Sequence, residues 1–381
     1  MTTRKRSVQV VRALGVLLGL NVLRAGAIDA PKTVTPAAPQ QQAAPAKVEI
    51  TPTDETAFYE RLQYVSHKRN LTGLGVSDEV LKSLGSGAVP AAISSLNSQS
   101  VAGDRNATIA LVRVQHWCSR ATSAKPADSQ AQLARLAPML PPPRLARVAG
   151  VFIAERAYQE KARQGCSSAP FDYNGIESRL RGAAQAGDPA SATELAQFVR
   201  DPAQREALQQ QAADKGYAPA MYALANSRLI GVQRGTNTEN VGSIRLLLKQ
   251  AGRTLSKAKV DLANCMALGC DGHPADAPQA AAFGLDAARD GEPTAFVSMM
   301  RMPWNQRLTR PQILAWQYFG DRLNENGCTG DAYVQTTVFY MQSLTMLEKG
   351  VPPKILEQAK TQAETLWQDN SQRAMHEQGC G

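Results

Sequence analysis

The sequence predicts an all-α protein, an α/α superhelical solenoid of antiparallel helix pairs with atypical helical caps at both ends. Aromatic residues make up only 6% of the 381 residues while alanine is abundant, a composition that favours closely packed helices over a β-sandwich or barrel. The chain also exceeds the roughly 250 to 300 residues over which a single core keeps growing, which suits an elongated array. Finally, alanine and glycine recur in a fixed pattern along the middle of the chain, and internal repeats of this kind are typical of solenoids.

The repeated pattern marks the point where one helix of a unit ends and the next begins. Alanines stand three or four residues before most of the central positions, and their small side chains let neighbouring helices approach to about 8 to 10 Å. Glycine at the centre predicts a left-handed residue just past the helix end. Thr238 and Asp276 each precede an apolar run and are predicted helix starts. The central positions lie 29 to 38 residues apart and are Gly187, Gly216, Thr254, Gly291 and Gly327.

One stretch of the repeats carries a family resemblance. Residues 212–231, AADKGYAPAMYALANSRLIG, resemble the first half of a Sel-one-like repeat, a relative of the tetratricopeptide repeat, and the resemblance covers about residues 180 to 330. It implies an α/α superhelix used as a protein-binding scaffold, without catalytic residues. The chain departs from the family pattern at Thr254, which stands where the helix-ending glycine belongs. The loops around Gly231 and Cys270 also lack the family's Gly-Val-x-x-Asp pattern.

We divide the chain into five regions. The apolar spacing within Glu55–His67, Asn106–Ala121 and Arg144–Gln164 predicts helices, but these do not fit the repeat register and are assigned to an N-terminal cap. The stretch after Gly330 is predicted to cap the other end of the solenoid. The regions are a signal peptide (1–27), a Pro/Ala/Gln-rich disordered linker (28–53), an N-terminal helical cap (54–170), the Sel-one-like repeats (171–330) and a C-terminal helical cap (331–381).

The start of the chain predicts export. Residues 1–12 are basic, an apolar stretch runs from Ala13 to Leu23, and small residues follow from Ala25 to Ala27, which together are typical of a secretory signal peptide. The apolar stretch is shorter than the roughly 20 residues of a membrane span, so no transmembrane anchor is expected. Because no cysteine follows it, no lipoprotein anchor is expected either. We therefore predict an exported protein of the periplasm or the extracellular space.

The six cysteines are expected to form three disulfides, because thiols of exported proteins are normally oxidised. Asn-Gly-Cys at 326–328 and Gln-Gly-Cys at 378–380 both resemble glycine-closed helix ends, so a bridge there would fasten the last helix to its neighbour. Six cysteines allow fifteen pairings, and short separation favours a local set. The predicted pairs are Cys118 with Cys166, Cys265 with Cys270, and Cys328 with Cys380.

The net charge of +9 does not indicate nucleic-acid binding. Five of the basic residues lie in the first 27 residues, which contain no acidic residue, so the rest of the chain carries only +4. The remainder has no dense cluster of lysine and arginine interleaved with aromatic residues, the pattern that nucleic-acid-binding proteins show. Nucleic acid is therefore not among the expected partners.

Few residues suggest catalysis or metal binding. The chain has four histidines and no zinc-protease helix motif, phosphate-binding loop or nucleophile elbow. Cys265, Cys270 and His273 form the nearest metal-like cluster, but an oxidising compartment favours a disulfide between the two cysteines. The pair Glu177 and Ser178 is similar to the acid–serine pair of lytic transglycosylases, yet no companion motif follows, and a solvated helix start is favoured. We predict no catalytic residue, no metal site and no cofactor.

The function predicted from these observations is binding of another protein. The concave face built from the first helices of successive units is expected to display the contact residues. An envelope protein, a toxin that this protein neutralises, and cell-wall glycan are the partner classes left open. The alternatives are a peptidoglycan-active enzyme similar to lytic transglycosylases, a glycan-binding protein, and a purely structural spacer. The candidate binding residues are Tyr217, Met221, Tyr222 and Lys259.

Overall fold

The computed structural model describes residues 52–123, 129–234, 242–270 and 273–381. Within these residues, every regular element is a helix. The predicted signal peptide, nearly all of the predicted linker and Thr238 lie outside these residues. The α-helices are α2 (Pro52–Asn70), α3 (Asp78–Gly85), α4 (Val89–Val101), α5 (Arg105–Ser123), α6 (Ser129–Leu136), α7 (Pro142–Ser167), α8 (Tyr173–Gln185), α9 (Pro189–Leu195), α10 (Pro202–Asp214), α11 (Ala218–Arg234), α12 (Ser243–Ala251), α13 (Ser256–Leu268), α14 (Ala277–Arg289), α15 (Pro293–Arg301), α16 (Arg310–Glu325), α17 (Tyr333–Glu348) and α18 (Pro353–Gln378). Two short 3-10 helices are η1 (Pro303–Arg307) and η2 (Gly330–Ala332).

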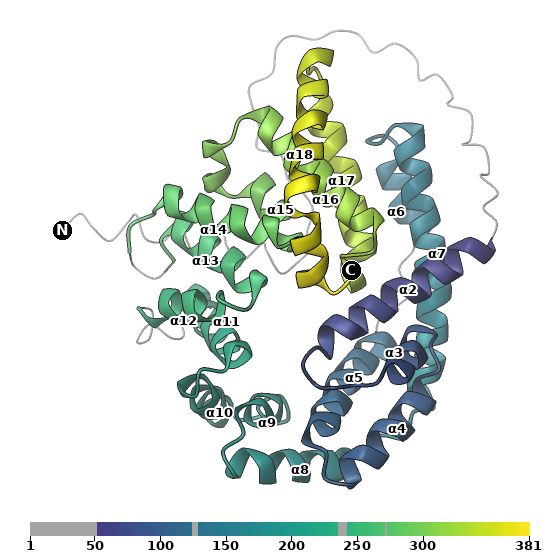
Figure 1. Cartoon of the computed structure of the whole chain (residues 1–381), viewed down its shortest axis with the longest axis vertical. Coiled ribbons are helices and arrows are strands. Elements are labelled where there is room, and N and C mark those ends of the chain that lie inside the picture. The colour runs from purple at the N-terminus through teal and green to yellow at the C-terminus, as the bar shows by residue number, and fades with distance from the viewer. Residues whose placement is uncertain (1–51, 124–128, 235–241, 271–272) are drawn as a thin grey trace.

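The helices pair around the predicted central positions, which confirms the solenoid. Five consecutive pairs pack against each other: α8 with α9, α10 with α11, α12 with α13, α14 with α15, and α16 with α17. Each connection is short, so the two helices of a pair run antiparallel. Figure 1 shows the pairs following one another along a curved path.

The glycines between the paired helices end them in the predicted left-handed conformation. Their φ angles are 92° at Gly187, 81° at Gly216, 74° at Gly291 and 79° at Gly327. The Gly216 N–H donates to the carbonyl of Ala213 at 2.8 Å, and the next N–H, of Tyr217, donates to Ala212 at 3.2 Å. These two bonds satisfy carbonyls that the helix end would leave unpaired.

The turn at Thr254 closes differently, because the left-handed conformation costs free energy for a residue with a Cβ atom. The N–H groups of Thr254 and Leu255 both donate to the carbonyl of Ala251, at 3.1 and 3.0 Å. The departure from the family pattern is therefore accommodated by a different closure of the same helix pair. The predicted start at Asp276 is confirmed, since its carboxylate accepts the N–H of Gln279 at 3.0 Å. The prediction of a loop around Gly231 is wrong, because α11 continues through this residue to Arg234.

One helix pair that the repeat pattern missed lies in the N-terminal region. Helices α4 and α5 pack together around Gly103, whose φ is 95°. Ala107 and Leu111, four and eight residues later, are buried like their counterparts in the repeats. The alanine signal is absent because serine stands three residues before the glycine; the Ser100 hydroxyl contacts that of Thr108 at 2.7 Å instead. A hydrogen-bonded polar pair replaces alanine packing at this turn.

All three predicted disulfides are confirmed. The bridge between Cys118 and Cys166 joins α5 to α7, and Cys265 with Cys270 ties the end of α13 to the following turn. Cys328 and Cys380 follow α16 and α18, two helices that pack closely together. The last bridge therefore fastens the final helix to its neighbour, as the two glycine-closed helix ends indicate.

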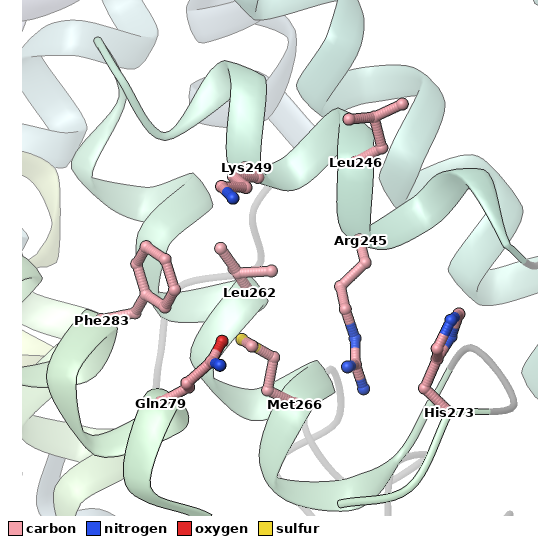
Figure 2. A pocket seen from close by; sticks show the side chains of 8 residues that line it. All are labelled: Arg245, Leu246, Lys249, Leu262, Met266, His273, Gln279 and Phe283. Carbon is pink, nitrogen blue, oxygen red and sulfur yellow. The ribbon is translucent and has the colours of Figure 1, made fainter. Parts of the chain in front are cut away.

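A surface pocket of about 290 Å³ opens between α12, α13 and α14 (Figure 2). Leu262 and Met266 of α13 and Phe283 of α14 supply apolar side chains to it, while α12 contributes Lys249 and Leu246 at its edge. The sequence analysis did not identify this pocket, because its residues come from three helices and no single pattern links them.

The two terminal regions pack against each other and close the solenoid into a ring (Figure 1). Helices α2 and α7 contact η2 and α17. The rings of Phe58 and Tyr333 lie 5.3 Å apart, and Arg69 donates a hydrogen bond to Gln378 at 2.9 Å. Both regions are helical as predicted. The sequence did not predict that the two terminal regions cover each other. We call the surface along which they meet the closure contact.

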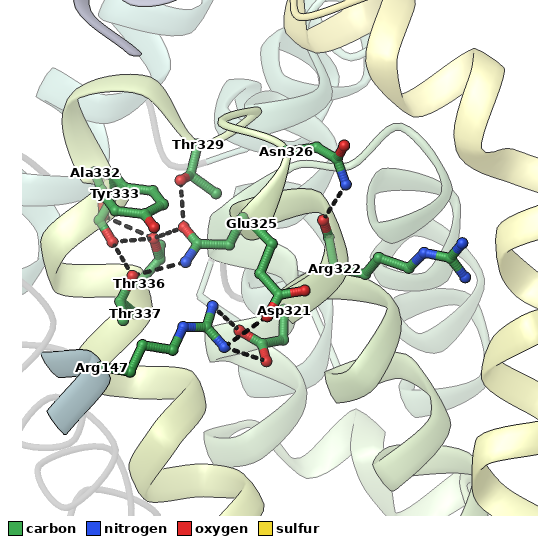
Figure 3. A network of polar contacts seen from close by, with 11 residues as sticks. Arg147, Asp321, Arg322, Glu325, Asn326, Thr329, Ala332, Tyr333, Thr336 and Thr337 are labelled. Carbon is green, nitrogen blue, oxygen red and sulfur yellow. Dashed lines mark hydrogen bonds and ion pairs between the residues drawn. The ribbon is translucent and has the colours of Figure 1, made fainter. Parts of the chain in front are cut away.

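Ion pairs hold the closure contact together (Figure 3). Arg147 of α7 makes two hydrogen bonds to the carboxylate of Asp321, at 2.9 and 3.1 Å, and an ion pair with Glu325 at 2.9 Å. One turn earlier on α7, Arg144 pairs with Glu348 at 2.6 Å. Burial raises the pKa of Asp321, and the adjacent Arg147 opposes that shift. Such bidentate pairs fix geometry as well as supplying energy.

Replacing Gly216 tests the left-handed turn. No atom stands within 4 Å of an added Cβ there, so Gly216→Ala introduces only backbone strain. We expect the free energy of unfolding to fall by about 1 to 2 kcal/mol. Gly182→Ala is the matched control: that site is equally open but lies inside α8, so the variant should gain roughly 0.5 to 1 kcal/mol. Equal effects in urea denaturation would contradict the turn assignment.

Replacing Arg147 tests the closure contact. Arg147→Met keeps the aliphatic stem but leaves Asp321, 14% exposed, without its cation. We expect a loss of about 2 to 3 kcal/mol in unfolding free energy, less than for a fully buried pair because Arg147 is 25% exposed. Lys360→Met, which breaks the solvent-exposed pair with Glu357, should lower the unfolding free energy far less, because both side chains lie mostly in water. Equal losses of unfolding free energy in the two variants, measured by urea denaturation, would contradict the closure contact.

Candidate functional site

The first helices of successive units lie next to one another, as the scaffold prediction requires. Helix α5 contacts α9, α9 contacts α11, α13 contacts α15, and α15 contacts α17. Figure 1 shows α5, α9 and α11 on the inner side of the ring, with α4, α10 and α12 outside them. The face that these first helices form is therefore the inner side of the closed solenoid.

Large half-buried side chains lie on or directly beside three of these first helices, α5, α9 and α11. The ring of His116 on α5 lies 6.2 Å from that of Phe198, which follows α9. Tyr217 directly precedes α11, and Met221 and Tyr222 lie near its start; all three pack partly against the core. We call these five residues the inner aromatic surface. Burial lowers the pKa of His116 and raises that of Tyr217, so both side chains are neutral at neutral pH.

An ion pair beneath this surface fixes the helices that carry it. Arg113 of α5 pairs with Glu194 of α9 at 2.8 Å, and the carboxylate is only 5% exposed. Gln197 donates to the second oxygen of Glu194 at 2.7 Å, so both oxygens are satisfied. Arg113 also donates to the backbone carbonyl of Asn70 at 2.6 Å, which connects α2 to the same cluster. Side chains set on such a frame lose little freedom when a partner binds.

The predicted binding residues fall into two groups. Tyr217 and Met221 are half-buried and contribute apolar surface. The Tyr222 hydroxyl donates to Asp261 at 2.8 Å, and the Lys257 ammonium lies 5.7 Å from its ring centroid. Burial raises the pKa of Asp261, an effect opposed by this hydrogen bond. Their role in binding stays a prediction.

Lys259 is engaged within the fold. Its ammonium lies 2.6 Å from carboxylate oxygens of both Asp286 on α14 and Asp290 at the C-cap of that helix, and its side chain is 16% exposed. Arg373 of α18 pairs with the same two carboxylates. The cluster therefore joins α13 and α14 to the last helix. Hydrogen bonds from Lys259 and Arg373 hold the pKa of Asp286 below its usual value, against the effect of burial.

The residues with possible catalytic or metal chemistry are placed as follows. Glu177 on α8 is 40% exposed and pairs with Arg181 one turn away at 2.6 Å, the arrangement of a solvated helix face. Cys265 and Cys270 are joined in a disulfide. Within the described residues, no group of three or more His, Cys, Asp or Glu side chains could hold a metal ion.

Sequence reasoning missed His116 and Phe198 as members of the surface. His116 lies among the apolar positions of α5, where its spacing gives no sign of a partner. Phe198 follows the short helix α9, 82 residues later in the chain. The packing of α5 on α9 brings them together, and the repeat pattern around Gly103, had it been visible, would have indicated that these helices are neighbours.

Comparison with solved structures gives a structural likeness. No protein-family model and no curated protein matches the chain. The chain is similar to a crystal structure of c5321, described as a protective antigen present in uropathogenic Escherichia coli strains and displaying an SLR fold. The two share 14% sequence identity over 84% of this chain and 86% of that chain, with a TM-score of 0.31. The all-α repeat fold of this chain rests on its own helix pairs and turns.

None of the helices in the described residues is long and apolar enough to cross a membrane. All six cysteines are paired in three disulfides, a state that persists in oxidising, extracytoplasmic compartments.

Proposed function

We propose that this protein is an exported scaffold that binds another protein through the inner aromatic surface of its ring. The observation that carries the proposal is the set of five large, half-buried side chains on or directly beside the neighbouring first helices α5, α9 and α11. Aromatic residues and methionine are enriched in protein interfaces, where a few of them supply most of the binding energy. The paired charges of Arg113 and Glu194 beneath them limit the entropy lost on binding.

The partner is another protein, and its two favoured classes are an envelope protein and a toxin that the scaffold neutralises. The three disulfides and the signal-like start of the sequence support a meeting place outside the cytoplasm. The peptidoglycan-active alternative would need a buried acid. Because Glu177 is exposed and paired with Arg181, no observation favours that alternative.

Site-specific photocrosslinking in the cell envelope tests the proposal. A photoreactive amino acid is placed at Tyr217 or Met221 on the inner side, and at the exposed Gln211 of α10 as the control. We expect one protein to crosslink from both inner positions and not from Gln211. Crosslinking of that protein mainly from Gln211, or recovery of glycan fragments with new ends and no protein, would contradict the inner surface as the binding site.

Truncation of the surface gives the quantitative test once the partner is known. The double variant Phe198→Ala and Tyr217→Ala removes two anchors, and we expect its dissociation constant to rise at least about thirtyfold, as for interface residues worth about 2 kcal/mol together. Gln211→Ala should stay within about twofold of the unaltered protein. Isothermal titration calorimetry measures both, with circular dichroism confirming that each variant is folded. Equal affinities would contradict the proposal.

A further inference from the structure

The ion pairs beside the inner aromatic surface expose their cations more than their anions. In the pair that joins α5 to the start of α9, the Arg105 side chain is 53% exposed and that of Asp188 is 14% exposed. In the pair beneath the surface, the Arg113 side chain is 25% exposed and that of Glu194 is 5% exposed. Helix α5 itself carries no acidic residue. A group that approaches from the inner side therefore meets guanidinium groups before it meets carboxylates.

Arg120 borders the inner aromatic surface at its α5 end. It follows His116 by four residues on this helix, so the two side chains share one face. The Arg120 side chain is 66% exposed, and its guanidinium stands 4.0 Å from the carboxylate of Asp331, whose side chain is 38% exposed. Because 4.0 Å is longer than a hydrogen bond, this ion pair engages none of the N–H donors of Arg120.

Lys257 borders the same surface at its α11 end. It is exposed at the start of α13, and its ammonium lies 5.7 Å from the ring centroid of Tyr222. A contact between a cation and a ring is weak where both touch water, so the ammonium can also pair with a bound anion. Asp261, one turn further along α13, already accepts the hydroxyl of Tyr222 at 2.8 Å.

The surface between these two cations is uncharged at neutral pH. Its five residues are aromatic or apolar, and burial keeps the pKa of His116 below its usual value. The surface therefore has an apolar centre with a cation at each end. A segment with apolar side chains between two acidic flanks matches this arrangement, whereas a basic segment would place like charges together.

We propose that the partner places on the inner aromatic surface a peptide segment that is apolar at its centre and acidic at both flanks. The apolar side chains cover Phe198 and Tyr217, and the flanking carboxylates pair with Arg120 and Lys257. This inference rests on the proposed function, because it names the chemistry of the partner at the same surface.

The test measures binding of a defined probe to the purified full protein. A fluorescein-labelled peptide containing Glu-Glu-Leu-Phe-Ala-Leu-Phe-Glu-Glu is titrated by fluorescence anisotropy, next to the same peptide with glutamine in place of each glutamate. We expect the acidic peptide to bind at least about tenfold more tightly than the glutamine peptide. The difference should shrink between about 20 mM and about 300 mM salt, because salt screens exposed charges.

Variants assign the binding to this surface. Arg120→Met and Lys257→Met each remove one cation and should weaken binding of the acidic peptide about threefold, with a smaller effect on the glutamine peptide. Lys354→Met is the control, since it removes a charge from the exposed start of α18 and should leave both affinities within about twofold. Circular dichroism checks that each variant is folded.

The double variant Phe198→Ala and Tyr217→Ala separates this inference from the proposed function. It should weaken both peptides at least about tenfold, because it removes the apolar centre that they share. If the two peptides bind equally tightly and both are weakened by this variant, the inner aromatic surface stands as a binding site and its acidic partner is rejected.

Four further outcomes would overturn the inference. They are the absence of peptide binding, equal losses with Arg120→Met and Lys354→Met, an acidic preference that the double variant leaves unchanged, and tighter binding of an oligothymidine strand than of the acidic peptide. The last result would assign the two cations to nucleic acid. In each case, photocrosslinking from Tyr217 and Met221 still decides the proposed function by itself.

Discussion

The closure contact between the two ends of the chain is the interaction on which the rest of the structure depends. At its centre the positive φ of Gly327 ends α16, and a Cβ atom added there would stand 2.8 Å from the side chain of Leu62 on α2. The same glycine therefore makes the turn and admits the opposite end of the chain. Beside it, Arg147 reaches from α7 to Asp321 on α16. Because an open solenoid can bend along its length, closing it fixes the curvature of all the pairs between these ends.

Closure gives the inner side of the ring its fixed geometry. Two charged clusters form a frame that holds the helices in place. Lys259 and Arg373 hold α13, α14 and α18 together through shared carboxylates, and Arg113 with Glu194 holds α5 against α9. The aromatic side chains rest on this frame with part of each ring in water. Under the proposed function, a partner would meet side chains already in position, and such preorganisation reduces the entropy cost of binding.

Most of the fold could be predicted from the sequence because its signals are local. Glycine after a helix and alanine at fixed offsets identify the paired helices, and short separations identify the disulfides. The pair around Gly103 was hidden because Ser100 and Thr108 meet through a hydrogen bond where other units use alanine. The closure could not be predicted, since it joins residues as distant as Leu62 and Gly327 without any periodic pattern. For the proposed site, Tyr217 and Met221 could be named as candidates from the repeat, whereas naming Phe198 needed the packing of α5 on α9.

A distance measured across the closure contact tests the central claim most directly. Asn70 and Glu377 are exposed and flank the hydrogen-bonded pair Arg69 and Gln378, so spin labels attached there through non-natural amino acids leave the disulfides intact. Double electron–electron resonance on the purified protein should give one narrow distribution at short distance, as a closed ring requires. A broad distribution centred at long distance would show an open superhelix and would contradict both the fixed curvature and the inner surface that depends on it.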